Sequence, residues 1–463
     1  MVRVSKAWGD DSCDYENGTG YFLETDTMKR YLFTAFFLLF LGEGCKKEPP
    51  VEPPPPPTHQ KTIYLTVEDV SCTEAWLKVS LTDLNDPRTI AITQDGQIKI
   101  TSRIAGADSV FLLENLLPHR SYRFAAQRMR DTTVTDTSGT VLAATLDSTS
   151  HNFSWQIDTL GDGNSSELND VAVVNDTLAY AVGEIYKRDS VGNWDPLPYN
   201  LVKWNGERWE LKRVPFYYQG STWYLPLRCI TAFAPDDIWF EAGIHWDGTR
   251  YITVPYTIDY PARINKSWGT SSRDFYVVGD AGLIAHYDGV RWRRIESGTT
   301  LPINDVFGVS KAGTTEVYAV AARLDQNEGR KILKIGSSTV TMLPDSGASW
   351  NLRGIWFTQR GPYYVVGAGV HYKQDVSSST PWNHYPPGEV TNYYSQAIRG
   401  SARNDVVVVG DFGEIVHFNG MTWKNYLSQT RINGSYYGVS IKGNIIIAVG
   451  QVQNRGVVAV GRR

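Results

Sequence analysis

A long pattern that occurs twice limits the fold of this 463-residue chain more than any other feature. Gly269–Trp292 reads GTSSRDFYVVGDAGLIAHYDGVRW, and Gly400–Trp423 reads GSARNDVVVVGDFGEIVHFNGMTW. The second copy begins 131 residues after the first, and Asp, Gly and Trp recur at the same offsets. Self-similarity at a long period is typical of repeat architectures. The sequence therefore predicts a fold assembled from copies of one unit.

The same unit can be followed seven times between His151 and Arg463. It contains strand-like segments, a small-residue end after the second segment, and an aromatic residue with Asp-Gly or Asn-Gly after the third. The 131-residue interval covers three units, or about 44 residues each, and four strands in 40–45 residues is typical of a β-propeller blade. The units contain Asn169–Trp209, Asp237–Tyr251, Gly269–Trp292, Asn304–Ile335, Gly354–Tyr372, Gly400–Trp423 and Tyr437–Val460, of which the fourth is degenerate.

An isolated strand-like segment, Phe153–Ile157, precedes the first unit, whereas the seventh unit has only three strands before Arg463. We therefore predict that residues 153–157 complete the seventh blade, which closes the ring and leaves no open sheet edge there. The repeat resembles the blades of bacterial secreted propeller proteins. This resemblance implies an all-β fold with a seven-bladed β-propeller over residues 151–463. It implies no particular function, because such blades serve lectins, scaffolds and enzymes alike.

Residues 28–45 have the features of a secretion signal. Two basic residues precede an apolar run of eleven residues (31–41), which is too short to span a bilayer, and Cys45 follows small residues. This order resembles a bacterial lipoprotein signal and implies that Cys45 is lipidated, with an ordinary secretory signal or a membrane anchor as the alternatives. Residues 1–27 are acidic and are expected to be an artefactual, untranslated leader. The expected location is the bacterial envelope, at the outer membrane, on either its periplasmic or its surface side.

A linker and a small domain are expected between the signal and the propeller. Residues 46–60 are rich in proline, which favours a stiff polyproline II spacer. Residues 61–147 show the alternation of a β-sandwich. Within them, Leu117–Phe124 resembles the L-P-x-x-x-Y-x-F segment of fibronectin type III domains. This resemblance implies that Tyr122 forms the tyrosine corner and that Trp76 is the core tryptophan.

Charge and cysteine content exclude several classes of function. The formal net charge is −4 with 20% charged residues, so there is no basic field for nucleic acid. Cys72 and Cys229 fall in different predicted domains, and we expect two buried thiols without a disulfide framework or a cysteine-based zinc site. No motif predicts a cofactor.

Recurrent histidine and aspartate residues are interpreted as structural. His245, His286, His371 and His417 are predicted to occupy the same place in four blades, where about 10 Å separates neighbouring sheets. Zinc ligands must lie much closer together, so we predict no metal site and expect packing or hydrogen bonding between blades. Aspartates that recur at turns or strand starts are expected to accept backbone N–H bonds; these are Asp170, Asp237, Asp274, Asp305 and Asp405.

Departures from the repeat mark the candidate binding residues. Three segments are expanded, Glu184–Asn200, Phe216–Leu227 and Ala322–Arg330, and all three are expected on the face that carries sites in propellers. Exposed aromatic residues with few charges suit sugar stacking or a protein contact, although the loops could instead pack together as a cap. The candidate residues are Tyr186, Trp194, Tyr199, Tyr217, Tyr218, Trp223, Tyr224 and Arg323.

The function that fits these observations is a non-catalytic binding or scaffold lipoprotein. It would be anchored to the membrane through lipid and would present a propeller face to a glycan or an envelope protein. The sequence has no G-x-S-x-G or H-E-x-x-H motif. One alternative is a glycan-active hydrolase or lyase with carboxylates on that face, and another is an envelope-assembly factor.

Overall fold

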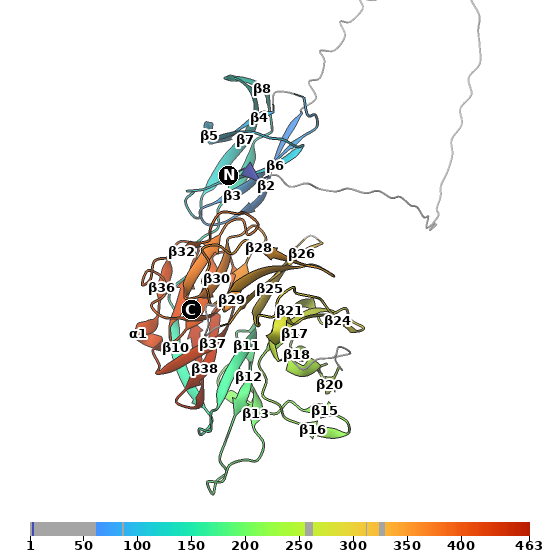
Figure 1. Cartoon of the computed structure of the whole chain (residues 1–463). Coiled ribbons are helices and arrows are strands. Elements are labelled where there is room, and N and C mark those ends of the chain that lie inside the picture. Colours follow the sequence, from blue (N-terminus) through green and yellow to red (C-terminus); the bar gives the residue numbers. More distant parts are fainter. Residues whose placement is uncertain (1, 4–61, 86–87, 255–262, 312, 324–328) are drawn as a thin grey trace, which may run out of the picture. The chain divides into compact units, whose positions relative to one another are not determined.

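The computed structural model describes residues 2–3, 62–85, 88–254, 263–311, 313–323 and 329–463 (Figure 1). Nearly all regular structure in these residues is β-strand. The helical segments among them are two 3-10 turns, Glu241–Gly243 and Asp280–Gly282, and the short helix α1 (Leu427–Thr430). No helix in the described part of the chain has the length and apolarity needed to cross a membrane. The chain divides into a smaller and a larger compact unit, built mainly from β1–β9 and from β10–β39.

The smaller unit consists of two antiparallel sheets, as expected for a β-sandwich. One sheet has the order β1-β6-β3-β2 and the other β5-β4-β7-β8, with β9 also paired to β7. Leu77, Ile90, Phe111 and Phe124 are completely buried between them. The strands are β1 (Val2–Arg3), β2 (Ile63–Val70), β3 (Ala75–Leu81), β4 (Thr89–Gln94), β5 (Gln97–Arg103), β6 (Asp108–Leu113), β7 (Ser121–Arg130), β8 (Thr133–Thr137) and β9 (Val141–Ala144).

The larger unit is a propeller with seven four-stranded antiparallel sheets, which we number as blades 1–7 (Figure 1). The first strands of successive blades contact one another around the ring. Blade 1 contains β11 (Glu167–Asn175), β12 (Leu178–Ile185), β13 (Tyr199–Trp204) and β14 (Trp209–Lys212); blade 2 contains β17 (Ile230–Ala234), β18 (Asp237–Phe240), β19 (Ile244–Trp246) and β20 (Tyr251–Thr253); blade 3 contains β21 (Ile264–Ser271), β22 (Asp274–Gly279), β23 (Ile284–Tyr287) and β24 (Trp292–Arg294).

The remaining blades follow the same order, and blade 4, degenerate in sequence, is complete in structure. Blade 4 contains β25 (Ile303–Lys311), β26 (Thr314–Ala322), β27 (Arg330–Ile335) and β28 (Val340–Leu343); blade 5 contains β29 (Gly354–Phe357), β30 (Tyr363–Gly367), β31 (Gly369–Lys373) and β32 (Asn383–His384); blade 6 contains β33 (Ser395–Ala402), β34 (Asp405–Gly410), β35 (Ile415–Phe418) and β36 (Trp423–Asn425); blade 7 contains β37 (Gly434–Lys442), β38 (Ile445–Val452), β39 (Arg455–Arg462) and β10 (Ser154–Leu160).

The predicted closure of the ring is confirmed. Strand β10 pairs with β39 in a continuous antiparallel register from Ser154↔Arg462 to Leu160↔Gly456. The chain just before β10 is tied to blade 6, because the hydroxyl of Tyr426 donates to the backbone oxygen of His151 at 2.6 Å. Blade 7 therefore combines two segments that are some 300 residues apart in the chain.

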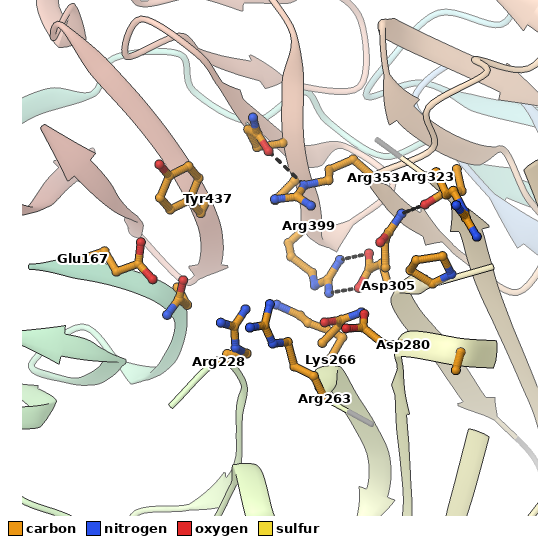
Figure 2. A pocket seen from close by; sticks show the side chains of 18 of the residues that line it. Glu167, Arg228, Arg263, Lys266, Asp280, Asp305, Arg323, Arg353, Arg399 and Tyr437 are labelled. Atoms are coloured by element: carbon orange, nitrogen blue, oxygen red, sulfur yellow. Dashed lines mark hydrogen bonds and ion pairs between the residues drawn. The ribbon is translucent and has the colours of Figure 1, made fainter. Parts of the chain in front are cut away.

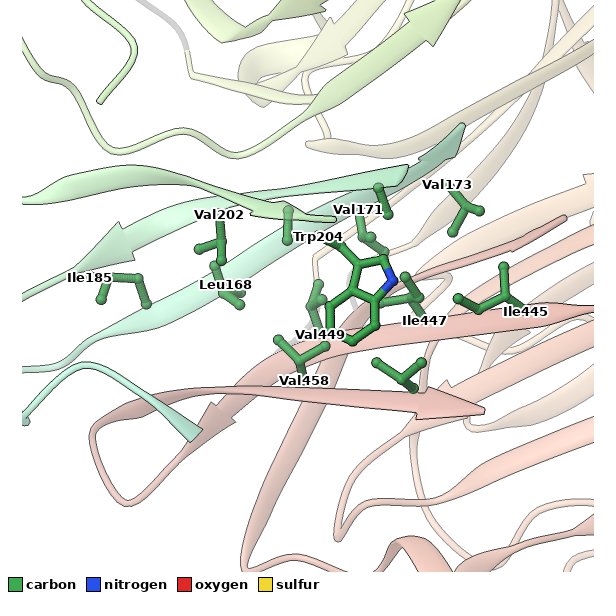
Figure 3. Packing of buried hydrophobic residues seen from close by; sticks show 13 residues of the cluster. Leu168, Val171, Val173, Ile185, Val202, Trp204, Ile445, Ile447, Val449 and Val458 are labelled. Atoms are coloured by element: carbon green, nitrogen blue, oxygen red, sulfur yellow. The ribbon is translucent and has the colours of Figure 1, made fainter. Parts of the chain in front are cut away.

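Apolar side chains fill the spaces between blades. Between blades 1 and 7, Trp204 is completely buried against Val171, Ile447 and Val458 (Figure 3). Burying an aromatic side chain removes about 200 Å² from water, so each such contact stabilises the ring by several kcal/mol, roughly 5 at 25 cal/mol per Å².

A close approach between blades explains the glycine that opens the second copy of the repeated pattern. The ring of Trp356 in blade 5 lies against Gly400 in blade 6, where an added Cβ would meet the ring at 2.5 Å. The Trp356 indole N–H also donates to the backbone oxygen of Gly400 at 3.1 Å. Trp268 and Gly308 repeat the contact between blades 3 and 4. Only glycine leaves room for the neighbouring indole at these positions.

Three of the four recurrent histidines have the structural role expected of them. His245, His286 and His417 on third strands bond to Asp237, Asp274 and Asp405 on second strands, with Nε2–Oδ1 distances of 2.8, 2.7 and 2.8 Å respectively. These bonds lie within a blade. The expected bonding or packing between blades is seen for His417, whose Nδ1 lies 2.9 Å from that of His151, just before β10 of blade 7.

The fourth histidine does not occupy the same place. His371 lies opposite Val365, two residues before Gly367, whereas His286 lies opposite Tyr276, three residues before Gly279. A shift of one residue turns a side chain to the other face of a sheet. The His371 ring accordingly contacts the backbone oxygens of Gly347 (3.1 Å) and Ala368 (3.3 Å) instead of an aspartate.

Candidate functional site

A cavity of about 870 Å³ opens where the first strands of the blades converge (Figure 2). Its walls come from the starts of first strands, the links that precede them, and the turns between second and third strands. We call this cavity the channel mouth. All seven blades, or the links that lead into them, contribute residues to it, so no single stretch of sequence contains the site.

The charges at the channel mouth are mainly positive, although the whole chain carries a net charge of −4. Six cationic side chains line it against three carboxylates. The cations are Arg228, Arg263, Lys266, Arg323, Arg353 and Arg399, and the carboxylates are Glu167, Asp280 and Asp305. A concave surface with an excess of one sign concentrates ions of the opposite sign, so the channel mouth favours an anionic ligand.

Two of these cations form ion pairs with an aspartate that lies two blades away in the ring. Lys266 in blade 3 contacts Asp170 in blade 1 at 2.5 Å. Arg399 in blade 6 holds Asp305 in blade 4 in a two-point contact, with N–O distances of 2.6 and 2.8 Å (Figure 2). Both aspartates are almost completely buried. Each pair therefore joins blades that are separated by one intervening blade.

Asp170 and Asp305 accept backbone N–H bonds, as expected, and each also reaches the following blade. The same expectation was wrong for Asp237, Asp274 and Asp405, whose carboxylates bond to side chains, including the histidine of the third strand. Asp170 accepts the backbone N–H groups of Val171 (2.9 Å) and of Ile230 in blade 2 (3.1 Å). Asp305 accepts those of Val306 (3.0 Å) and of Ile355 in blade 5 (2.9 Å). These bonds fix the positions from which Lys266 and Arg399 approach.

The other guanidinium groups are arranged differently. Among the described residues, no carboxylate lies within 4.0 Å of the Arg228 or Arg263 side chains, which point into the cavity in Figure 2. The Nε of Arg353 donates to the Gln396 side chain at 2.8 Å, and burial lowers the pKa of Arg353. Arginine stays protonated in proteins, so the channel mouth keeps its positive charge at every physiological pH.

A buried carboxyl group adjusts the charge beside Arg228. Glu241 in blade 2 accepts the backbone N–H of Arg228 at 2.7 Å. Burial raises the pKa of Glu241 to about 7, although this bond and the charges of Arg228 and Arg263 partly oppose the shift. Below about pH 7 the carboxyl group becomes neutral and offsets less of the positive charge of the two arginines.

Of the residues expected at a binding face, Arg323 lies at the channel mouth and none of the seven aromatic residues does. Tyr217, Tyr218 and Trp223 lie on a hairpin of β15 (Phe216–Tyr218) and β16 (Ser221–Trp223), and their side chains are 50%, 55% and 55% exposed. Tyr224 follows this hairpin directly. The structure thus separates the aromatic residues from the arginine.

The remaining three aromatic residues are held by neighbours within blade 1. The Arg188 guanidinium lies 4.1 Å from the Trp194 ring centre, and that of Arg213 lies 3.9 Å from the Tyr199 ring centre. The Tyr186 hydroxyl bonds to Glu184. These contacts order the loop between β12 and β13.

Sequence reasoning missed the main residues of the channel mouth. Arg228, Arg263 and Arg353 each stand within two residues of the start of a first strand, and Lys266 and Arg399 lie inside first strands. Basic residues recur at this place in four units, blades 2, 3, 5 and 6, and this signal could have been recognised once the blades were identified.

Comparison with known proteins supports the fold and does not identify a family. No protein-family model and no curated protein matches this chain. The solved structure of YCF48 bound to a D1 peptide is similar, with 14% identity and a TM-score of 0.50 over 68% of this chain and 99% of that chain. YCF48 from Cyanidioschyzon merolae is also similar, with 13% identity and a TM-score of 0.45 over 65% of this chain and 98% of that chain. BBS1N in complex with ARL6DN has 11% identity and a TM-score of 0.41 over 66% of this chain and 96% of that chain.

The observed sheets and the likeness to YCF48 at a TM-score of 0.50 define the class of fold. The chain is an all-β protein whose larger part is a seven-bladed β-propeller. At these identities the likeness shows the fold alone.

Proposed function

We propose that this protein is a binding protein whose channel mouth holds an acidic segment of a partner protein. The observation that carries the proposal is the excess of cations, in particular Arg228 and Arg263, which lack a carboxylate partner among the described residues. The planar guanidinium group matches the geometry of a carboxylate, and such bonds are strong where water is partly excluded.

The size of the channel mouth favours a polypeptide segment over a single small ion. About 870 Å³ lies in the upper part of the range seen for ligand sites, and it would accept several side chains. The similar propeller YCF48 was solved with a D1 peptide, which supports a peptide ligand for this fold. The glycan-active alternative needs a pair of free carboxylates, whereas Asp305 is held by Arg399 and Asp280 accepts a bond from Asn265 at 2.9 Å, which leaves Glu167 as the third carboxylate of the lining.

The test is a binding assay with the full-length protein and a labelled peptide of alternating Asp and Glu residues, compared with its Asn/Gln counterpart. We expect the acidic peptide to bind, and we expect Arg228→Gln with Arg263→Gln to weaken binding about tenfold or more. The matched control is Arg208→Gln with Arg250→Gln. It removes the same charge from side chains that are 78% and 77% exposed, on turns between third and fourth strands.

Two results would contradict the proposal. Equal weakening by both double variants would indicate unspecific attraction by total charge. Binding of polygalacturonate without binding of the acidic peptide would indicate a glycan ligand.

We further propose that the propeller is held at the bacterial envelope through lipid on Cys45. This residue and the 46–60 linker lie outside the described residues, so the support is the sequence of residues 28–45. The smaller unit would serve as a fibronectin type III-like spacer, which its two-sheet order and its buried Trp76 and Tyr122 support. A role in envelope assembly would use the same anchor and channel mouth.

The anchor is tested by growing producing cells with a labelled fatty acid. The wild-type protein should carry the label and Cys45→Ser should not. A variant that keeps the label would refute lipidation at Cys45, while Cys72→Ser serves as a control that removes a different thiol.

A further inference from the structure

A second cavity, which we call the interblade slot, lies between blades 1 and 2 and encloses about 170 Å³. Half of its lining residues are aromatic (Tyr180, Phe240, Trp246 and Tyr251), and the others are Leu201, Ile238, Lys203 and Lys212. Lys212 is paired with Glu210 at 3.2 Å. It is separate from the channel mouth, with which it shares no lining residue. Its volume suits one six-membered ring and excludes a longer segment of chain.

The corresponding space between blades 4 and 5 is filled by aromatic rings. Tyr180 lies opposite Lys203 on neighbouring strands of blade 1, and Tyr318 lies opposite Lys334 in the same way in blade 4. The Tyr318 ring packs against Phe357 and Tyr363, with ring centres 4.9 and 5.5 Å apart. Tyr180 has no such ring contact among the described residues, so the slot is open where blades 4 and 5 are packed.

Polar groups in the slot need a partner. In the described part of the chain, the hydroxyls of Tyr180 and Tyr251 make no hydrogen bond, and no carboxylate lies within 4.0 Å of Lys203. Burial raises the pKa of Tyr251 to about 12, so its hydroxyl is a donor at neutral pH. A purely apolar ring would leave all three groups unsatisfied, which is unfavourable in a partly buried site.

We propose that the interblade slot binds one pyranose ring that carries a carboxylate, such as a uronic acid unit of a glycan. The apolar face of the sugar would stack on Trp246 and Tyr251, its hydroxyls would bond to the two phenols, and its carboxylate would meet Lys203. The β15–β16 hairpin extends this surface. It lies beside β20, where the Tyr217 backbone N–H donates to Thr253 at 3.1 Å, and Tyr217 is half exposed.

The experiment measures binding of methyl glucuronate and methyl galacturonate glycosides to the full-length protein by saturation-transfer NMR. Methyl glucoside and 4-hydroxyphenylacetate are the comparison ligands. We expect a uronate to bind most tightly and Lys203→Gln to weaken it about tenfold, because a charge-assisted bond is lost. Lys334→Gln is the matched control, since this lysine has the equivalent position in blade 4.

Three outcomes would overturn the proposal: no saturable uronate binding, tighter binding of the aromatic acid, or equal weakening by Lys203→Gln and Lys334→Gln. The channel-mouth variant Arg228→Gln with Arg263→Gln should leave uronate binding unchanged. If that variant abolishes it, the sugar binds at the channel mouth and the slot is not its site. The result is thus independent of whether an acidic peptide binds at the channel mouth.

Discussion

Replacing Arg399 with methionine is expected to lower the free energy of unfolding by about 3–5 kcal/mol, because the change leaves a buried carboxylate without its partner. Asp305 has a side chain only 5% exposed and takes two charge-assisted bonds from Arg399. Methionine fills a similar volume without charge, so the loss reports the unpaired Asp305 and not a cavity. Urea unfolding at pH 7 measures the change.

Two further variants separate this effect from a general loss of packing. Combining Arg399→Met with Asp305→Asn removes both charges and should recover part of the lost stability. Arg293→Met removes an ion pair with Asp288 in which the arginine side chain is 58% exposed, and it should change stability by about 1 kcal/mol or less. If Arg399→Met behaves like Arg293→Met, the pair across the ring does not stabilise the propeller.

Asp405→Asn is expected to destabilise the protein by about 2–4 kcal/mol at pH 7 and by much less near pH 2. Asp405 joins three parts of the propeller. It is bonded by His417 at 2.8 Å in its own blade, by Ser401 at 2.5 Å, and by both terminal nitrogens of Arg463 at 2.7 and 2.9 Å. The last contact links blade 6 to the end of β39 in the closing blade.

The pH dependence follows from the pKa of this carboxyl group. Burial alone would raise the pKa of Asp405, but the bonds from His417, Arg463 and Ser401 outweigh it and lower the pKa from 3.8 to about 2. Because the pKa of Asp405 is lower in the folded state than in the unfolded state, its ionised carboxylate stabilises the fold at pH values above the unfolded-state pKa. This contribution, about 2 kcal/mol, is therefore complete above about pH 4 and is lost as the pH falls towards 2.

The measurement is the free energy of unfolding of the wild type and of Asp405→Asn at intervals from pH 7 to pH 2. The wild-type curve should fall more steeply than that of the variant below pH 4. Arg463→Gln should show a smaller loss at pH 7, because His417 and Ser401 remain bonded to Asp405. Parallel curves for wild type and Asp405→Asn would contradict the assigned role.

The propeller could be predicted because the sequence pattern of nearly every blade lies in one continuous segment and recurs along the chain. The sequence of each blade predicts four short strands with small residues at fixed offsets. Only the seventh blade lacked a strand, so the isolated segment 153–157 was assigned to it. Sequence spacing failed for His371, because the turn before it is shorter: Gly367 and His371 are four positions apart, whereas Gly279 and His286 are seven apart. The shorter turn pairs His371 with Val365 and places its side chain on the other face of the sheet. Pairing partners cannot be read from residue types alone.

The ion pairs of the channel mouth could not be predicted, because their charges meet only when the ring closes. Lys266 and Asp170 are 96 residues apart, and Arg399 and Asp305 are 94 apart, with no local feature that connects them. The expanded loops were predicted to carry the binding residues because they depart from the repeat. Of the candidate residues in them, only Arg323 lines this cavity. Arg228, Arg263 and Arg353, which also line it, stand one or two residues before a first strand.

The two ion pairs also bear on where the ring could be divided. Asp170 and Lys266 both belong to blades 1–3, and Asp305 and Arg399 both belong to blades 4–6. Each set of three blades therefore contains both halves of its own electrostatic tie. A break between blades 3 and 4 would therefore leave both pairs intact, whereas a break inside either set of three blades would separate an aspartate from its cation.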